Sequence, residues 1–378
     1  MKKVAIIGTA QTTCTNVKNE IFYDLTSEAA SLALADAGLE RRDLDNIVLG
    51  EYDLAIGRTA SHMYTVPAAG GFYRDEMRIN DDGLFAAIQA YLGILSGEYD
   101  ITLVLSTGIS SEAPQETVSN LGLDPFFHRP LGLTESMANA LQVLCYRQRY
   151  GITALQGAGV VVKNRRSALE NPRAHLRTAL TTDDVFHSPY TVYPLKEAEC
   201  APRSDGACAV VMAAEPVARR LCRYPVWITG AGWCNDTYYL GDKDLARLTA
   251  LEKAAAQAYR QAGITAAFDG IDVAEVYDVT AYHELMIYEA LGFCGPGEGG
   301  KLLDTGATQR HGRLPVNPSG GVLAARPLSA TGLVRLSEAV LQLTDRASGR
   351  QVGEAGTALV QSMTGWGNQR AAVMILQR

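Results

Sequence analysis

The chain contains one pattern of apolar segments twice, and this internal duplication restricts its fold more than any other feature. An apolar stretch that ends in glycine occurs at residues 4–8 (VAIIG) and again at 226–230 (VWITG). A predicted helix that closes on an Ala-Gly pair follows each stretch, with Gly38 and Gly263 at the expected C-caps. These glycines are 225 residues apart, and a Tyr-Asp pair further along repeats at the same separation. Each half is therefore predicted to begin as strand, helix, strand.

A second pair of segments extends the duplication. Residues 83–95 (GLFAAIQAYLGIL) correspond to residues 332–344 (GLVRLSEAVLQLT), at an offset of 249. Each predicted helix leads to an apolar strand, at 102–108 and at 357–365. Two copies of a β-α-β-α-β unit predict an α/β fold with helices against mostly parallel sheets. The two halves are expected to pack as layers around a pseudo-twofold axis.

Residues 111–202 have no counterpart in the second half. Proline, histidine and arginine are unusually dense in this segment, and helical patterns cover residues 133–150 and 155–170. We interpret the segment as a long insertion, and insertions on a rigid core often carry substrate contacts. The predicted organisation is an N-terminal half of residues 1–110 plus 203–220, an insertion of residues 111–202, and a C-terminal half of residues 221–378.

Composition excludes several classes of protein. Hydrophobic residues make up 47% of the 378 residues, which suits a globular chain with a large core. The net charge of −7 argues against a nucleic-acid partner, and no apolar run is long enough to span a membrane. The seven cysteines are scattered without a Cys-x-x-Cys, so we expect neither a disulfide framework nor a bound metal, and a cytoplasmic location. Motifs for nucleotide hydrolysis, hydride transfer and metalloprotease chemistry are lacking.

Four local motifs resemble those of the thiolase superfamily, and most closely its sterol-carrier-protein-type and archaeal branch. They are 203–212 (RSDGACAVVM), 288–294 (YEALGFC), 317–321 (NPSGG) and 327–332 (PLSATG). The resemblance covers essentially the whole chain. It implies a thiolase fold, in which the two halves form a layered α-β-α-β-α arrangement. It also implies a coenzyme A thioester as substrate, no bound cofactor, and a homodimer that pairs across the edge strand of the first half.

The positions that carry thiolase chemistry have changed. The family's nucleophilic cysteine lies three residues before the glycine that opens the first central helix, and Asn80 lies there in this chain. The branch's His-Asp-Cys-Phe motif reads YDVT, so Tyr277 replaces the oxyanion-hole histidine and Val279 the acid/base cysteine. Arg326 replaces the histidine of Gly-His-Pro. Because an amide cannot form an acyl-enzyme, ordinary cysteine-dependent thiolysis is not expected.

The replacement residues suit a different cleavage of carbon–carbon bonds. A phenol can donate and accept a hydrogen bond, an arginine is a permanent cation, and acidic residues are favoured at a helix N-terminus. Retro-aldol cleavage fits these groups: a base takes the proton of a β-hydroxyl, the C–C bond breaks, and an oxyanion hole holds the enolate of the thioester. The candidate catalytic residues are Tyr277, Arg326, Asn80, Asp81, Asp82 and His283.

Some thiolase-fold aldolases resemble this scheme, since they lack the nucleophile and use tyrosines. One of those tyrosines is similar in place to Tyr277, whereas a second is expected where Arg326 stands. These aldolases work with a small partner in which a zinc ribbon is fused to an OB-fold, so the resemblance implies such a partner here. Candidate contacts for the substrate or for coenzyme A are Asn317, Gly320, Gly321, Gly365, Phe127 and His128.

Structural roles remain open for several of these residues. Residues 80–82 also fit a helix cap with first-turn acids. Tyr277 also fits a half-buried strand tyrosine, because Tyr52 takes the matching place in the first half. His283 also fits a packed histidine. Arg165, with its neighbours, fits a solvated helix face better than a site for coenzyme A phosphates.

Three functions are compatible with the sequence. The first is an acyl-CoA lyase or condensing enzyme that works by retro-aldol chemistry without a cysteine. The second is a non-catalytic thiolase subunit that supports a complex or binds CoA esters. The third is an acyltransferase whose nucleophile is one of the seven cysteines at a new position.

Overall fold

The computed structural model describes residues 3–16, 21–57, 60–111 and 114–378. Nine strands form one sheet in the order β3-β2-β4-β7-β1-β8-β11-β10-β9, and β5 and β6 form a small ribbon. The strands are β1 (Val4–Gln11), β2 (Asn46–Gly50), β3 (Asp75–Ile79), β4 (Ile101–Ile109), β5 (Tyr190–Val192), β6 (Leu195–Lys196), β7 (Asp205–Ala214), β8 (Val226–Asn235), β9 (Val273–Glu275), β10 (Thr357–Thr364) and β11 (Arg370–Gln377).

Helices lie between most of the strands of each half, as the duplicated pattern predicts, although several helices also follow one another directly. The helices are α1 (Phe22–Ala37), α2 (Asp53–Ile56), α3 (His62–Ala69), α4 (Gly83–Ser96), α5 (Gln115–Leu121), α6 (Glu135–Tyr150), α7 (Ala154–Ala168), α8 (Thr182–His187), α9 (Glu215–Leu221), α10 (Thr249–Ala262), α11 (Ala267–Gly270), α12 (Ala281–Ala290), α13 (Gly299–Asp304) and α14 (Thr331–Leu343). Glycines in the left-handed conformation cap α1 at Gly38 and α10 at Gly263, as expected.

The sheet order repeats outward from its middle. The first half runs β1-β7-β4-β2-β3 and the second β8-β11-β10-β9. In the described strands, the halves are joined by the pairs Ala5 with Trp227 and Ile6 with Val226. The prediction of mostly parallel sheets is wrong, because five of the eight pairings between described strands of the nine-stranded sheet are antiparallel. The reason is that β7 and β11 each return beside the strand before them in the sheet, β4 and β10, instead of crossing over in parallel.

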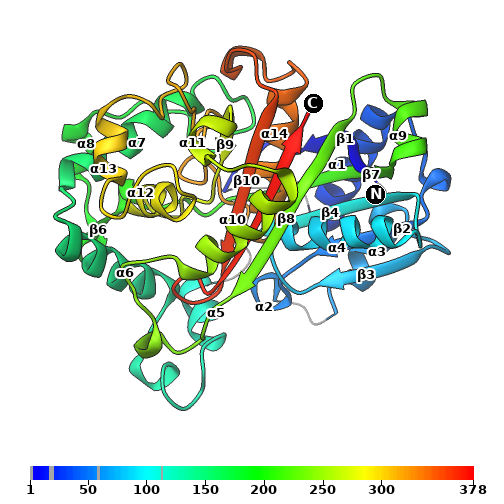
Figure 1. Cartoon of the computed structure of the whole chain (residues 1–378). Coiled ribbons are helices and arrows are strands. Elements are labelled where there is room, and N and C mark those ends of the chain that lie inside the picture. Colours follow the sequence, from blue (N-terminus) through cyan, green and yellow to red (C-terminus); the bar gives the residue numbers. More distant parts are fainter. Residues whose placement is uncertain (1–2, 17–20, 58–59, 112–113) are drawn as a thin grey trace.

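Helices form layers on both faces of the sheet (Figure 1). Helices α4 and α14 share one apolar core with strands of both halves, so they form the central layer. Their N-termini cross closely, since a Cβ added at Gly83 would lie 2.7 Å from that of Leu333. Helix α1 packs on the outer face of the first half, and α10 packs on β8 and β11 of the second. This is the layered α-β-α-β-α arrangement that the family resemblance implies.

Strands β2 and β9 end sooner than their apolar patterns suggest. The backbone N–H of Val276 donates to Asn317 Oδ1 at 2.8 Å, and that of Tyr277 donates to Gln361 Oε1 at 2.8 Å. These side-chain acceptors replace sheet partners, so the chain leaves the sheet after Glu275. The segment beyond β9 therefore projects past the carboxyl end of a parallel strand pair, where ligand sites of α/β sheets are found.

The 111–202 segment contributes α5 to α8 and the small ribbon. Helices α6 and α7 contact α12, and α7 also contacts α13, on the side of the molecule opposite α1, α3 and α4 (Figure 1). Helix α5 instead contacts α2 and α6. The boundaries that we gave the insertion and the two halves remain predictions. No helix in the described ranges has the length and apolarity needed to cross a membrane.

Candidate functional site

A cavity of about 240 Å³ lies where the two halves and the 111–202 segment meet. It brings together six of the twelve residues that the sequence singled out: Asn80, Asp81, Asp82, Tyr277, Arg326 and Gly365. Its other lining residues are Tyr52, Gln115, Val118, Ser119, Glu135, Leu328, Ser329, Thr364, Trp366 and Arg370. None of the described lining residues is a cysteine, so no other cysteine in this lining takes the place of the missing thiolase nucleophile.

Tyr277, Arg326 and Glu135 form a connected group on one wall. Arg326 Nε donates a hydrogen bond to the Tyr277 hydroxyl at 3.1 Å, and Arg326 also forms an ion pair with Glu135. Because the phenolic oxygen accepts from Arg326, its own proton is available to a substrate oxygen. The arrangement therefore presents a hydrogen-bond donor that is backed by a fixed positive charge.

Burial determines the protonation of this group. Tyr277 is 4% exposed, and burial raises its pKa to about 12, although Arg326 opposes the shift. Burial by itself would lower the pKa of Arg326, but Glu135 and Tyr277 hold it above its usual value. At neutral pH, Tyr277 is therefore a neutral phenol and Arg326 a cation, which suits the stabilisation of an oxyanion.

Asp82 joins the N-termini of the two central helices. Its carboxylate accepts from the backbone N–H of Leu84 at 3.0 Å in α4 and of Gly332 at 2.8 Å in α14. Burial raises its pKa to about 7 even though both N–H groups favour the charged form. The expected helix cap is thus present, and the same carboxyl group titrates near neutral pH, where a general base is most effective.

Asp81 and Asn80 lie beside this cap. Asp81 forms an ion pair with Arg370 of β11, and its pKa is nevertheless raised, because burial outweighs the arginine. Asn80 Oδ1 accepts from the backbone N–H of Asp53 at 3.4 Å. The position of the family's nucleophile is therefore occupied by a neutral amide that points toward the first-half tyrosine segment.

The sequence missed several lining residues. Tyr52 follows β2 as Tyr277 follows β9, so both tyrosines of the duplicated pair line the same cavity. The duplication could have identified Tyr52, which was treated only as a structural counterpart. Glu135 and Arg370 carried no sequence signal, because they come from segments that are distant in sequence and meet only in the fold.

The loop between β10 and β11 closes one side of the cavity with Gly365 and Trp366. Lys243 Nζ donates to the carbonyl oxygens of Trp366 at 3.2 Å and Gly367 at 2.9 Å. Gly365 and Gly367 both have positive φ angles, of 76° and 56°, which explains why glycine is needed there. The loop is thus fixed by its glycines and by one half-buried lysine.

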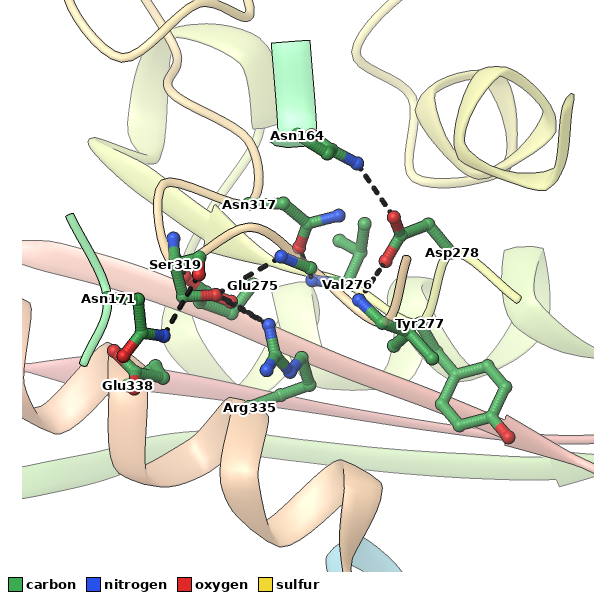
Figure 2. Close-up of polar contacts among 12 residues, drawn as sticks. Asn164, Asn171, Glu275, Val276, Tyr277, Asp278, Asn317, Ser319, Arg335 and Glu338 are labelled. Atoms are coloured by element: carbon green, nitrogen blue, oxygen red, sulfur yellow. Dashed lines mark hydrogen bonds and ion pairs between the residues drawn. The ribbon is translucent and has the colours of Figure 1, made fainter. Parts of the chain in front are cut away.

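Asn317, Gly320 and Gly321 lie outside the cavity lining. Figure 2 shows Asn317 among the polar residues behind Tyr277. Asn317 Nδ2 donates to Glu284 Oε2 at 2.8 Å, while its Oδ1 holds Val276. Gly321 has a φ of 68°, and a Cβ there would lie 2.6 Å from the carboxylate oxygens of Asp278. In Figure 2 the Tyr277 ring points away from this network. Direct substrate contact by these three residues receives no support from their placement.

The structure also places His283 away from the cavity. It is fully buried, with Nδ1 2.8 Å from Thr280 Oγ1 and Nε2 3.1 Å from Gln142 Oε1. Burial lowers its pKa to about 3, so it stays neutral. Both nitrogens already have partners, which agrees with the packed-histidine alternative and leaves the catalytic role without support.

Phe127 and His128 belong to an aromatic group beyond the cavity. The His128 ring lies 5.0 Å from that of Tyr239, and the exposed Phe127 ring lies 6.1 Å from the same tyrosine. Neither lines the cavity. In the parts of the chain that the structure describes, no group of three or more potential ligands is arranged to hold a metal ion.

Comparison with known proteins agrees with this geometry. Residues 232–378 match the family model described as thiolase C-terminal domain-like. The chain is 32% identical over 389 residues to the acetyl-CoA acetyltransferase of Methanothermobacter thermautotrophicus, with 100% of both chains covered. It is 28% identical over 365 residues to the 17-hydroxy-3-oxo-4-pregnene-20-carboxyl-CoA lyase of Mycobacterium tuberculosis, covering 90% of this chain and 91% of the lyase.

A solved structure extends the comparison to three dimensions. The Ltp2-ChsH2(DUF35) aldolase superposes with a TM-score of 0.87 and 25% identity, covering 99% of this chain and 97% of that one. The layered duplicated fold, the C-terminal family match and the full-length relative together show that this chain belongs to the thiolase superfamily.

Proposed function

We propose that this protein cleaves or forms a carbon–carbon bond in an acyl-CoA thioester by (retro-)aldol chemistry, without an acyl-enzyme. The observation that carries the proposal is the Tyr277–Arg326–Glu135 group in a cavity whose described lining holds no cysteine. Relatives named as an acetyltransferase and as a CoA lyase support action on CoA thioesters, and a structural neighbour named as an aldolase supports the reaction type.

In the proposed cleavage, the substrate is a 3-hydroxyacyl-CoA. Asp82, whose pKa is raised to about 7 by burial, accepts the proton of the 3-hydroxyl group. The electrons of the O–H bond then form the C=O bond of C3, which leaves as a carbonyl compound. The electron pair of the broken C2–C3 bond stays with C2 and forms the thioester enolate. A proton returned to C2 gives the shorter acyl-CoA, so the reaction needs neither water nor free coenzyme A.

Stabilisation of the enolate is assigned to the opposite wall. The Tyr277 hydroxyl donates to the enolate oxygen, and Arg326 adds positive charge behind it. The N-termini of α4 and α14 meet at Asp82, and their dipoles favour negative charge in the same cavity. Removing one such oxyanion donor in other enzymes lowers turnover about 100- to 1000-fold.

The alternative of a relocated cysteine nucleophile has one structural candidate. Cys200 lies in cavities that adjoin Arg326. Burial raises the pKa of its thiol to about 12, so the thiolate that would attack a thioester is scarce at neutral pH. This protonation state favours the aldol scheme.

The deciding experiment is a mass-spectrometric assay of the purified chain with 3-hydroxyacyl-CoA and 3-oxoacyl-CoA panels, each with and without free coenzyme A. Cleavage of hydroxy substrates in the absence of free coenzyme A is the expected result. Cleavage of oxo substrates only in its presence would replace the proposal by thiolysis. Binding of CoA esters without any turnover would favour a non-catalytic subunit.

We further propose a homodimer through the β3 edge of the sheet. Strand β3 ends the sheet order, so one of its edges lacks a strand partner within the described chain. Large apolar side chains are exposed on and near it: Met63, Tyr64, Phe72, Tyr73 and Met77. Such an edge is normally covered in a native protein. Size-exclusion chromatography with light scattering, with and without a zinc-ribbon/OB-fold partner, tests both the dimer and that partner.

A further inference from the structure

A second cavity, of about 950 Å³, adjoins the candidate site. Glu135, Arg326 and Leu328 line both cavities, so the two spaces meet at the Tyr277–Arg326–Glu135 group. A substrate that reacts beside Tyr277 can therefore extend into the second cavity. Its walls come from α7, from residues 175–203 and from the segment after β4.

Arg165 of α7 lines this cavity, and among the described residues it has no partner for its side chain. The sequence suggested a solvated helix face, but the residue is only 9% exposed. Its Nε is buried without an acceptor, and no hydrogen bond or ion pair from the described residues reaches its guanidinium. Burial lowers the pKa of Arg165, because no carboxylate compensates its charge.

The other two arginines of the described cavity wall are neutralised by the chain itself. Arg326 pairs with Glu135, and Arg203 pairs with Glu116 at 3.5 Å. A buried cation is costly unless it is paired, so an arginine held without a carboxylate is arranged for an anion from outside. The planar guanidinium matches a carboxylate in two-pronged geometry.

A short hydrogen-bonded path connects His175, which lies close enough to Arg165 to feel its charge, to the reacting group. His175, whose pKa is lowered by burial and by Arg165, lies with Nδ1 2.9 Å from Ser204 Oγ. Ser204 Oγ accepts from the backbone N–H of Arg326 at 3.1 Å. Arg165 is thus placed near the thioester site and within the same space.

The charge of the walls indicates which anion fits. Among the described lining residues, the three arginines face four acidic side chains: Glu116, Glu135, Asp184 and Glu197. His175 stays neutral at physiological pH because its pKa is lowered. Such a surface repels the several charges of coenzyme A phosphates, whereas one carboxylate matches the one unpaired cation.

We propose that Arg165 binds a carboxylate at the far end of the acyl group, so that the substrate is a dicarboxylic acyl-CoA. This inference rests on the proposed function for the placement of the thioester, but the carboxylate site can be tested without turnover. The probes are saturated acyl-CoA esters, which have no 3-hydroxyl group to cleave. One series ends in a carboxylate and a second ends in a methyl group, and each is also made as a pantetheine thioester without phosphates.

Calorimetric titration of the full chain measures the affinities. We expect the wild type to bind carboxylate-ended esters more tightly than methyl-ended ones, and Arg165→Met to lose about tenfold or more only with the former. Arg166→Met is the matched control, because Arg166 is the exposed neighbour on the same helix, and its affinities should not change. Arg165→Lys keeps the charge without the planar fork, so its affinity for carboxylate-ended esters should lie between those of wild type and Arg165→Met. It replaces Arg165→Met in the test if that variant does not fold.

Three results would overturn the inference. The first is equal affinity of wild type and Arg165→Met for every probe. The second is a loss with all CoA esters but with no pantetheine thioester, which would assign Arg165 to the coenzyme A phosphates. The third is the absence of any preference of the wild type for a terminal carboxylate. Failure of the cleavage assay alone would refute the proposed reaction and leave this titration valid.

Discussion

Replacing Tyr277 by phenylalanine tests the proposed chemistry most directly. The change removes one oxygen, which accepts from Arg326 Nε at 3.1 Å, in a residue that lines the cavity. The ring stays in place, since its backbone is held by Gln361 and the residue is 4% exposed. Arg326 keeps its ion pair with Glu135. The variant should therefore fold with the same cavity but lack the hydroxyl group that is proposed to donate to the enolate oxygen.

The magnitudes separate an effect on catalysis from an effect on folding. Leaving Arg326 Nε without an acceptor costs about 1–3 kcal/mol of unfolding free energy, which a chain with this core tolerates. Loss of a donor to the developing oxyanion costs about 100- to 1000-fold in kcat. Because burial keeps the Tyr277 pKa at about 12, the wild type should show no loss of activity from its deprotonation below pH about 11.

The assay is the initial rate of acyl-CoA release from the best 3-hydroxyacyl-CoA, followed by mass spectrometry with kcat and KM determined separately. Tyr259→Phe is the matched control, because its hydroxyl donates to Leu291 O at 2.8 Å in the outer layer, away from the cavity. It should lose a similar amount of stability and no kcat. A kcat of Tyr277→Phe within about threefold of wild type would refute the reasoning, since no oxyanion donor is that dispensable.

Three further changes test other parts of the structure. The Asp82 pKa rises on folding from 3.8 to about 7, so this residue's contribution to the unfolding free energy should decrease as the pH rises from about 4 to about 7. Urea titrations of Asp82→Asn should lack this pH dependence. A difference in unfolding free energy between wild type and Asp82→Asn that does not change with pH would contradict the prediction. Gly321→Ala, with a φ of 68° and a Cβ 2.6 Å from Asp278, should lose about 2–4 kcal/mol in chemical denaturation, whereas Gly353→Ala, with nothing within 4 Å, should change by about 0.5 kcal/mol or less. Cys200→Ala should keep at least half of the cleavage rate, and its inactivation would restore the cysteine-nucleophile alternative.

Much of the fold was predictable because it depends on local periodicity. The two Gly-Leu helices and the capping glycines at Gly38 and Gly263 are encoded by residues close together in sequence. Strand direction was not predictable in the same way. The antiparallel returns of β7 and β11 depend on which strand each finds as a neighbour, and the apolar pattern of a buried strand is the same in either direction.

The candidate site divides along the same line. The duplication and the family motifs located Tyr277, Arg326 and Asp82, because each lies at the end of a repeated element. They did not show that Glu135 pairs with Arg326, which is 191 residues away, or that Asp81 pairs with Arg370, which is 289 residues away. His283 also follows β9 closely in sequence, yet the first turn of α12 directs its ring into the core.

The sequence alone determined the identity of the repeated elements and of the side chains that stand where thiolase chemistry would be, because periodicity, caps and motif spacing are properties of short segments. Only the tertiary structure decided which of those side chains share a cavity and which of the described arginines around the second cavity, namely Arg165, has no carboxylate beside it. The physical reason is that burial and electrostatic pairing depend on groups from all parts of the chain, and a side chain's protonation and reach are fixed only when those groups meet.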